Sequence, residues 1–201
     1  MGNLVIDGIT VENREDKTIR ELAKSVGITV PTLCHLPKKE PRAVCRICVV
    51  EIAGRPGLVS ACSTRASDGM EIRTQSETVL RTRRTLMEFI LAEHGEFCDS
   101  DAKIQALACE LGVIRSRFSL PEKDHSHYRA IENEYIKLHV EKCIHCDRCI
   151  RACADRNVIT RKGFGFNVTL AFDNDVAIDD SSCVQCGDCV HACPSGAISA
   201  V

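Results

Sequence analysis

The segments KCIHCDRCIRAC, at residues 142–153, and SCVQCGDCVHACP, at residues 182–194, decide how this chain folds. Each contains the spacing Cys-x2-Cys-x2-Cys-x3-Cys, and a proline follows the last cysteine of the second copy. This is the ligand spacing of bacterial ferredoxins with two [4Fe–4S] clusters, in which the fourth cysteine of each run ligates the other cluster. The sequence therefore predicts a two-cluster ferredoxin domain that moves single electrons.

The crosswise rule gives each predicted cluster its own ligands. Cluster one is expected to take Cys143, Cys146, Cys149 and Cys193, and cluster two Cys153, Cys183, Cys186 and Cys189. Structural zinc sites usually combine two ligand pairs across a spacer, with four ligands in all. Two copies of one four-cysteine spacing therefore favour iron–sulfur clusters over zinc.

The composition indicates a protein of a reducing compartment. Fourteen of the 201 residues are cysteine, and the opening MGNLVIDGIT lacks the basic flank and apolar core of a signal peptide. In a reducing, cytoplasmic setting, cysteine more often binds metal than forms disulfides. No apolar run approaches the roughly 18 residues of a membrane span. A net charge of −2 argues against nucleic-acid binding.

The segment 1–75 reads as a small, β-rich α+β unit. LVIDGITV alternates around Asp7-Gly8, which predicts a β-hairpin. TIRELAKSVG has the periodicity of an amphipathic helix that ends at Gly27. VCRICVVEI and GLVSACST predict further strands.

Four more cysteines lie in this N-terminal unit, with the spacing C-x10-C-x2-C-x13-C. They are Cys34, Cys45, Cys48 and Cys62. The spacing differs from the plant-type ferredoxin pattern, in which the first gap is short. By themselves, four thiolates on a small domain could hold a [2Fe–2S] cluster, a zinc ion or nothing. The ferredoxin runs downstream favour a [2Fe–2S] cluster.

The middle of the chain is predicted to be helical. Residues 75–92 form an amphipathic pattern that Thr74 and Glu77 would open as a capping box, and residues 103–111 repeat apolar residues up to Gly112. The apolar side of the first of these helices is expected to comprise Val79, Leu86, Met87, Phe89 and Ile90.

The chain is predicted to divide into four parts. They are 1–75 for the [2Fe–2S] unit, 76–115 for the helical region, 116–138 for a polar linker or arm, and 139–201 for the ferredoxin unit. Within the last part, residues 164–178 between the two cysteine runs alternate between apolar and polar and predict a pair of strands.

Together these segments resemble a known family, the N-terminal iron–sulfur module of the large iron–sulfur subunit of respiratory complex I. The same module resembles the small electron-transfer subunit of NAD-reducing hydrogenases and the front end of NAD-dependent formate dehydrogenases. The resemblance rests on PTLCHLP, VCRICVVEI, GLVSACST, KCIHCDRCIRAC and SSCVQCGDCVHACPSGAI. It implies a β-grasp [2Fe–2S] domain, a helical middle and a domain with two [4Fe–4S] clusters.

The chain departs from this family in its helical middle. Members usually carry a further cluster site there, with the pattern H-x3-C-x2-C-x5-C. His94 and Cys98 match its start, but Asp101 and Ala102 occupy the next two cysteine positions, and Cys109 lies inside the following helix. Two ligands cannot hold a full cluster, so His94 and Cys98 are predicted to be vestigial and not to bind metal. The alternative is that His94, Cys98 and Cys109 bind something else, or that a partner chain completes the site.

The predicted function is electron transfer within a multi-subunit cytoplasmic oxidoreductase. No G-x-G-x-x-G or P-loop motif is present, so no nucleotide site, flavin site or catalytic residue is expected on this chain. The sequence ends at Val201, eight residues after Cys193, so we expect the catalytic domains fused to this module in some relatives to lie on other chains. The resemblance implies two partners in a hetero-oligomer: a flavin- and NAD(P)-binding subunit, and a catalytic subunit of hydrogenase, formate dehydrogenase or bifurcating type.

Two other functions are compatible with the motifs. The chain could be a free-standing soluble ferredoxin with several clusters that meets its partners by diffusion. It could also be a structural subunit whose clusters only hold the fold together, as metals do in other small sites.

Overall fold

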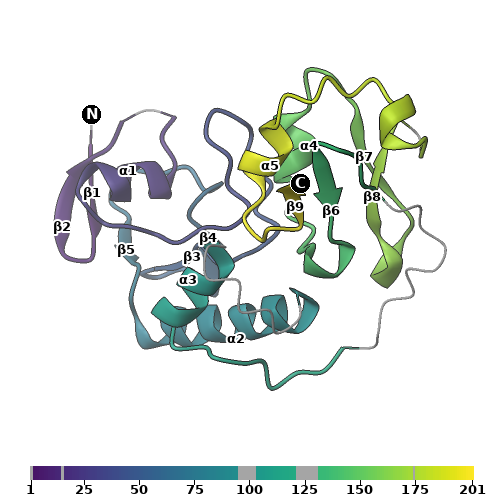
Figure 1. The fold of residues 1–201 in the computed structure, drawn as a ribbon. Helices are drawn as coiled ribbons and strands as arrows, with labels where there is room; N and C mark the ends of the chain where they lie inside the picture. The colour runs from purple at the N-terminus through teal and green to yellow at the C-terminus, as the bar shows by residue number, and fades with distance from the viewer. Residues whose placement is uncertain (1, 15, 95–102, 121–130, 174) are drawn as a thin grey trace.

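The computed structural model describes residues 2–14, 16–94, 103–120, 131–173 and 175–201. Two units with β-sheets lie side by side, an N-terminal one in purple and blue and a C-terminal one in green and yellow (Figure 1). Helix α2 (Glu77–His94) runs along both and contacts β3 (Val49–Ile52) in the first unit and the 3-10 helix η1 (Val140–Lys142) in the second. The cysteine-bearing loops of the two units therefore meet above one helix.

The N-terminal unit is built on a five-stranded sheet in the order β2-β1-β5-β3-β4. Besides β3, its strands are β1 (Asn3–Ile6), β2 (Ile9–Glu12), β4 (Leu58–Ser60) and β5 (Glu71–Arg73). Strands β1 and β5 are parallel and the other pairs are antiparallel. The predicted hairpin is confirmed, because Asp7 and Gly8 take φ values of 48° and 84° and turn β1 into β2.

Helix α1 (Ile19–Ser25) packs against this sheet and closes its core. Thr18 and Glu21 form a capping box at its start, and Ile19, Leu22 and Ala23 are buried. The buried residues of the sheet that meet this helix are Leu4, Ile6, Val11, Val50, Ile52 and Ile72. The predicted helix and the predicted α+β class are both confirmed.

Helix α2 begins differently from the sequence-based prediction. Thr74 does not cap it, because its hydroxyl and backbone N–H both donate to the carboxylate of Asp7, at 2.5 and 2.7 Å. The Ser76 hydroxyl instead accepts from Val79 N–H at 3.3 Å. The expected capping box is therefore wrong, since the hairpin turn competes successfully for Thr74.

The buried face of α2 also differs from the one that the apolar pattern predicts. Its buried residues are Val79, Arg83, Met87, Leu91 and His94. These lie three or four residues apart, so they form one stripe along the helix. Phe89 is 47% exposed and stacks on Phe118 with ring centroids 4.2 Å apart. Val79 and Met87 are thus buried as predicted, whereas Arg83 and His94 belong to the buried stripe although the apolar pattern did not include them.

Helix α3 (Lys103–Glu110) and the loop ahead of the first cysteine site share a second core with α2. The members of this core are Leu33, Ile47, Met87, Leu91, Ile104, Leu107, Ala108, Leu111 and Val113, with Cys45 and Ile144 packed at its edge. Gly112, at φ 70°, ends α3 as predicted. Because Ile144 belongs to the C-terminal unit, this core joins the two units.

Two short antiparallel sheets and two one-turn helices form the C-terminal unit. Its elements, besides η1, are β6 (Ile136–Leu138), α4 (Arg148–Ala152), β7 (Ile159–Lys162), η2 (Gly165–Asn167), β8 (Thr169–Phe172), η3 (Ile178–Asp180), α5 (Asp188–Ala192) and β9 (Ile198–Ala200). Strand β6 pairs with β9 although it lies in the predicted linker 116–138. Strand β8 pairs with β7, which comes before the segment 164–178 expected to hold both strands.

The described residues contain no helix that is long and apolar enough to cross a membrane.

The first testable prediction concerns the buried arginine of α2. The Arg83 guanidinium is 4% exposed and donates to the Val49 carbonyl at 2.8 Å. Arg83→Ala leaves that carbonyl unpaired, which costs about 2 kcal/mol and lowers the thermal unfolding midpoint of the cluster-loaded protein by about 4–8 °C. Circular dichroism under anaerobic conditions measures this shift. Arg81→Ala, at an exposed position of the same helix, is the control and should leave the midpoint nearly unchanged.

Candidate metal centres

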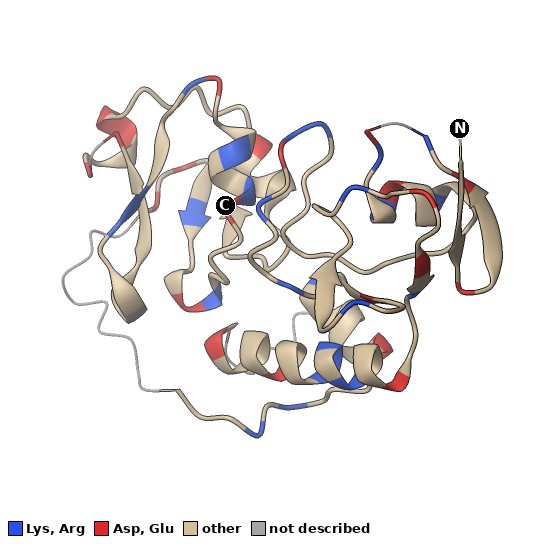
Figure 2. Cartoon of the chain, turned by 180° about the vertical axis from the view of Figure 1, so that it is seen from behind, with Lys and Arg blue, Asp and Glu red and all other residues tan. Residues whose placement is uncertain are grey.

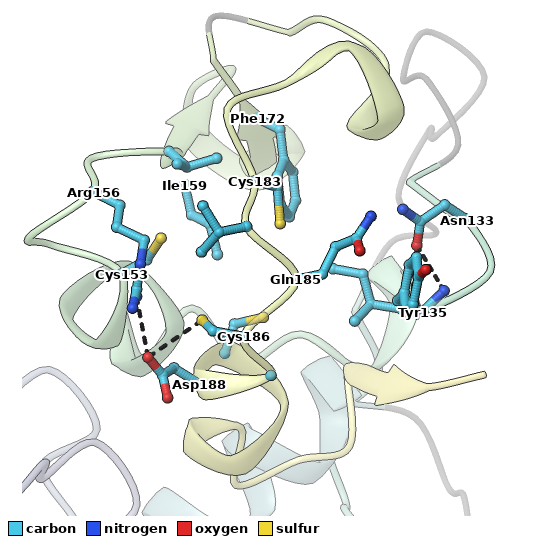
Figure 3. Close-up of a pocket in the computed structure, with 15 residues that line it drawn as sticks. Asn133, Tyr135, Cys153, Arg156, Ile159, Phe172, Cys183, Gln185, Cys186 and Asp188 are labelled. Carbon is cyan, nitrogen blue, oxygen red and sulfur yellow. Dashed lines mark hydrogen bonds and ion pairs between the residues drawn. The ribbon is translucent and has the colours of Figure 1, made fainter.

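One cavity of the C-terminal unit lies between the two one-turn helices and is lined by cysteines of both runs. These are Cys153, Cys183, Cys186 and Cys189. Figure 3 shows the sulfur atoms of Cys153, Cys183 and Cys186 bordering the same space, with Phe172 and Ile159 among the apolar side chains around it. At its rim, Asp188 accepts from Arg156 at 3.1 Å and from the Cys186 thiol at 3.3 Å.

A second cavity is lined by the complementary cysteines. These are Cys143, Cys146, Cys149 and Cys193. Cys146 and Cys149 are buried, whereas Cys186 in the first cavity is exposed. Each cavity thus gathers the first three cysteines of one run and the last cysteine of the other. This is the crosswise grouping expected from the spacing, and ligation by these sets stays a prediction.

The two cysteine runs adopt the same backbone turns. His145 and Gln185 stand at equivalent positions and take φ values of 51° and 56°. Asp147 and Gly187, two residues further on, take φ values of 59° and 75°. Glycine adopts this left-handed conformation without strain, whereas Asp147 is held by ion pairs with Arg42 at 3.1 Å and Arg161 at 2.6 Å. The repeated sequence therefore produces a repeated loop that turns its cysteines inward.

The four cysteines of the N-terminal unit are also brought together. Cys34, Cys48 and Cys62 are buried, and the Cys34 N–H donates to the Cys45 sulfur at 3.4 Å. A hydrogen bond from the Cys45 thiol lowers the pKa of Cys34 to about 6, and one from the Cys62 thiol lowers the pKa of Cys48 to about 7. The thiol pKa values of Cys45 and Cys62 rise in turn.

The donor sets fit iron–sulfur clusters. Thiolate is the ligand that such clusters use, and Cys34 and Cys48 are disposed to ionise near neutral pH. In the C-terminal unit, burial raises the thiol pKa of Cys146 to about 12 and of Cys189 to about 11. Metal binding must displace those protons, so acidic conditions oppose loading. Among the described residues, no three His, Cys, Asp or Glu side chains lie close enough to hold a single metal ion.

His94, predicted to be a vestigial ligand, is buried at the end of α2. Its side chain is 1% exposed, and its Nε2 donates to the Ser195 carbonyl at 3.1 Å. The Ser195 hydroxyl lies 3.5 Å from the Cys193 sulfur. His94 therefore anchors the loop that carries the last cysteine of the second cavity. Cys98, Asp101 and Ala102 lie outside the described residues, whereas Cys109 is exposed on α3.

Sequence reasoning missed the basic residues that join the two units. Arg148 and Arg151 of α4 donate to backbone carbonyls of the loop that begins the [2Fe–2S] site. Arg42 of that loop reaches Asp147, and Lys39 reaches Asp155 at 3.4 Å. Figure 2 shows Lys and Arg gathered where this loop meets the helices of the C-terminal unit. The only signal in the sequence was two arginines three residues apart within a cysteine run.

Comparisons with known proteins agree with this division into sites. A model of 2Fe–2S iron–sulfur cluster binding domains matches residues 3–77, and one of 4Fe–4S dicluster domains matches residues 142–197. The fold and sites thus define an iron–sulfur protein with one [2Fe–2S]-type domain and one [4Fe–4S] dicluster domain. These two domains are those of the family that the motifs resemble.

Relatives span NAD(P)-linked oxidoreductases. The HndD chain of the NADP-reducing hydrogenase of Solidesulfovibrio fructosivorans is 36% identical over 98% of this chain, which covers 36% of that protein. The gamma chain of the NAD-reducing hydrogenase HoxS of Cupriavidus necator is 32% identical over 76% of this chain, which covers 66% of that protein. The crystal structure of an NAD+-reducing [NiFe]-hydrogenase in the H2-reduced state contains a chain with a TM-score of 0.86 and 28% identity, covering 99% of this chain and 87% of the other.

The chain belongs to the family of iron–sulfur modules found in complex I large iron–sulfur subunits, NAD-reducing hydrogenases and related formate dehydrogenases. The chain spans 36% of the length of HndD and 24% of the matching NADH-quinone oxidoreductase chain of Rhizobium meliloti. Much of what those proteins contain thus lies outside the aligned region.

Proposed function

We propose that this chain relays electrons within a larger NAD(P)-linked oxidoreductase of the cytoplasm. The observation that carries the proposal is the presence of three cysteine-lined sites in units that share one packed core. The site in the N-terminal unit adjoins that core through Cys45, and the cavity with Cys143 adjoins it through Ile144. Sites that adjoin one shared core suit the passage of electrons between them better than independent structural metals would.

The proposed cofactors are one [2Fe–2S] and two [4Fe–4S] clusters. The [2Fe–2S] cluster would be held by Cys34, Cys45, Cys48 and Cys62, cluster one by Cys143, Cys146, Cys149 and Cys193, and cluster two by Cys153, Cys183, Cys186 and Cys189. When bound, such clusters each accept and release a single electron at a potential set by their surroundings. His94 and Cys98 are not included, because His94 already serves the Ser195 loop.

The residues of this chain would tune the three sites differently. Backbone N–H groups reach sulfur at the [2Fe–2S] site, from Cys34 to Cys45 at 3.4 Å, and at the cluster-one site, from Ile198 to Cys193 at 3.5 Å. Hydrogen bonds to sulfur and nearby positive charge raise the potential of a cluster, and solvent exposure also changes it. Cluster two, with Cys186 exposed, would have the most solvated surroundings.

The proposed partners are a flavin- and NAD(P)-binding subunit and a catalytic subunit, with no catalytic residue contributed by this chain. The names of the relatives, which include an NADP-reducing hydrogenase and an NADH-quinone oxidoreductase, support this assignment. A permanent subunit should co-purify with those partners from its native source under anaerobic conditions. Elution as an isolated 22.1 kDa chain would instead favour a diffusible ferredoxin.

Iron content and electron uptake test the cofactor assignment. Anaerobically prepared protein should contain about ten iron atoms per chain, and reductive titration should consume about three electrons, one for each cluster. Cys98→Ala should leave both values unchanged. About fourteen iron atoms per chain would mean that the His94 region holds a further cluster. Clusters that resist reduction would favour a structural role.

The crosswise ligand sets are tested by two matched variants. Cys153→Ala should damage cluster two, and Cys193→Ala should damage cluster one, although each residue belongs to the run of the other cluster. Electron paramagnetic resonance of the reduced protein should distinguish the two losses, because Arg151 links the cluster-one site to the [2Fe–2S] site and a magnetic interaction between these two is expected. Loss of cluster one in the Cys153 variant would contradict the assignment.

A further inference from the structure

Helix α4 joins the cluster-one site to the [2Fe–2S] site through two arginine side chains. The Arg151 guanidinium donates to the carbonyl of Cys34, to the carbonyl of Glu40 at 3.1 Å, and to the carbonyl of Cys146 at 3.5 Å. Arg148, which is 7% exposed, donates to the carbonyl of Leu33 at 3.3 Å. One side chain of α4 thus contacts the backbone of a predicted ligand in each of two sites.

The hydrogen bonds of Arg151 have a geometric consequence. The guanidinium is a rigid planar fork, so acceptors bonded to the same group are held at a fixed separation. The carbonyls of Cys34 and Cys146 both accept hydrogen bonds from the Arg151 guanidinium, and the sulfurs of both residues are predicted ligands. The spacing of the two sites therefore depends on this side chain as well as on the apolar core that the two units share.

The same residue has an electrostatic consequence. All described hydrogen bonds of the Arg151 guanidinium end on backbone carbonyls, which carry no net charge. The two carboxylates four residues away along the chain are already paired, Asp147 with Arg42 and Arg161 and Asp155 with Lys39. The junction thus carries an excess of positive charge, and positive charge near a cluster favours its reduced form.

We propose that Arg151 is a positioning residue that fixes the separation of the [2Fe–2S] site and the cluster-one site and raises the reduction potentials of both. This inference rests on the proposed electron-transfer function. Arg148 reinforces the contact from the preceding turn of the helix, at the residue before Cys34. Arg151 lines neither cavity, but none of its described hydrogen bonds reaches a predicted ligand of cluster two.

The test uses the cluster-loaded chain and two readouts that do not depend on turnover. Redox titration followed by electron paramagnetic resonance gives the midpoint potential of each cluster. The magnetic interaction between the reduced [2Fe–2S] cluster and reduced cluster one reports their separation. Arg151→Gln should shift both potentials to more negative values, weaken the magnetic interaction and leave the potential of cluster two unchanged.

Two further variants complete the experiment. Arg151→Lys keeps the charge but lacks the fork, so its potentials should stay near those of the parent protein while the magnetic interaction weakens. Lys39→Ala removes another contact across the junction, the ion pair with Asp155, and should change neither readout.

Several outcomes would overturn the inference. In a loaded Arg151→Gln protein, an unchanged magnetic interaction and unchanged potentials would do so. If that variant loses a cluster, the Arg151→Lys protein decides: a magnetic interaction equal to that of the parent contradicts the positioning role, and a weaker one supports it. Failure of the parent chain to hold reducible clusters would refute the proposed function itself, which separates the two hypotheses.

Discussion

Inward-facing cysteine sulfurs are the constraint on which the C-terminal unit depends. Each cysteine run must turn its backbone through left-handed residues, at His145 and Asp147 in one copy and Gln185 and Gly187 in the other. The helices that follow are only five residues long, and three of the ten buried residues in the core around them are cysteines, Cys149, Cys153 and Cys189. Because these cysteines are predicted ligands, bonds to metal would supply much of the folding free energy of this unit.

The sequence predicted the elements that local chemistry determines. The Asp7-Gly8 hairpin, the helix ending before Gly27 and the helix ending before Gly112 follow from turn residues and periodicity close by in the chain. The start of α2 could not be predicted in this way, because Thr74 binds Asp7, 67 residues earlier. The burial of Arg83 and His94 could not be predicted for the same reason, because their hydrogen-bond acceptors, the carbonyls of Val49 and Ser195, lie in other parts of the fold.

The grouping of cysteines followed from spacing, whereas the relation between the sites did not. The spacing within one run determines which sulfurs share a loop. Because the run occurs twice, it also predicts that the last cysteine of each run joins the first three cysteines of the other. The contact between the N-terminal site and the cluster-one site depends on arginine side chains that donate to backbone carbonyls. Every residue has a backbone carbonyl, so the sequence cannot show which one accepts such a bond. Tertiary contacts of this kind determine how the two domains are joined, and the amino-acid sequence does not predict them.

The exposure of Cys186 has a consequence for oxygen tolerance. The other predicted ligands are buried or partly covered, so Cys186 presents the part of the three sites most open to solvent. Oxidants attack thiolates according to their exposure and ionisation. In air, damage should therefore begin at cluster two and spread inward, which the order of signal loss in timed exposure would reveal. Any protein surface that covers Cys186 in an assembled complex would then act as a shield against oxidation as well as a contact.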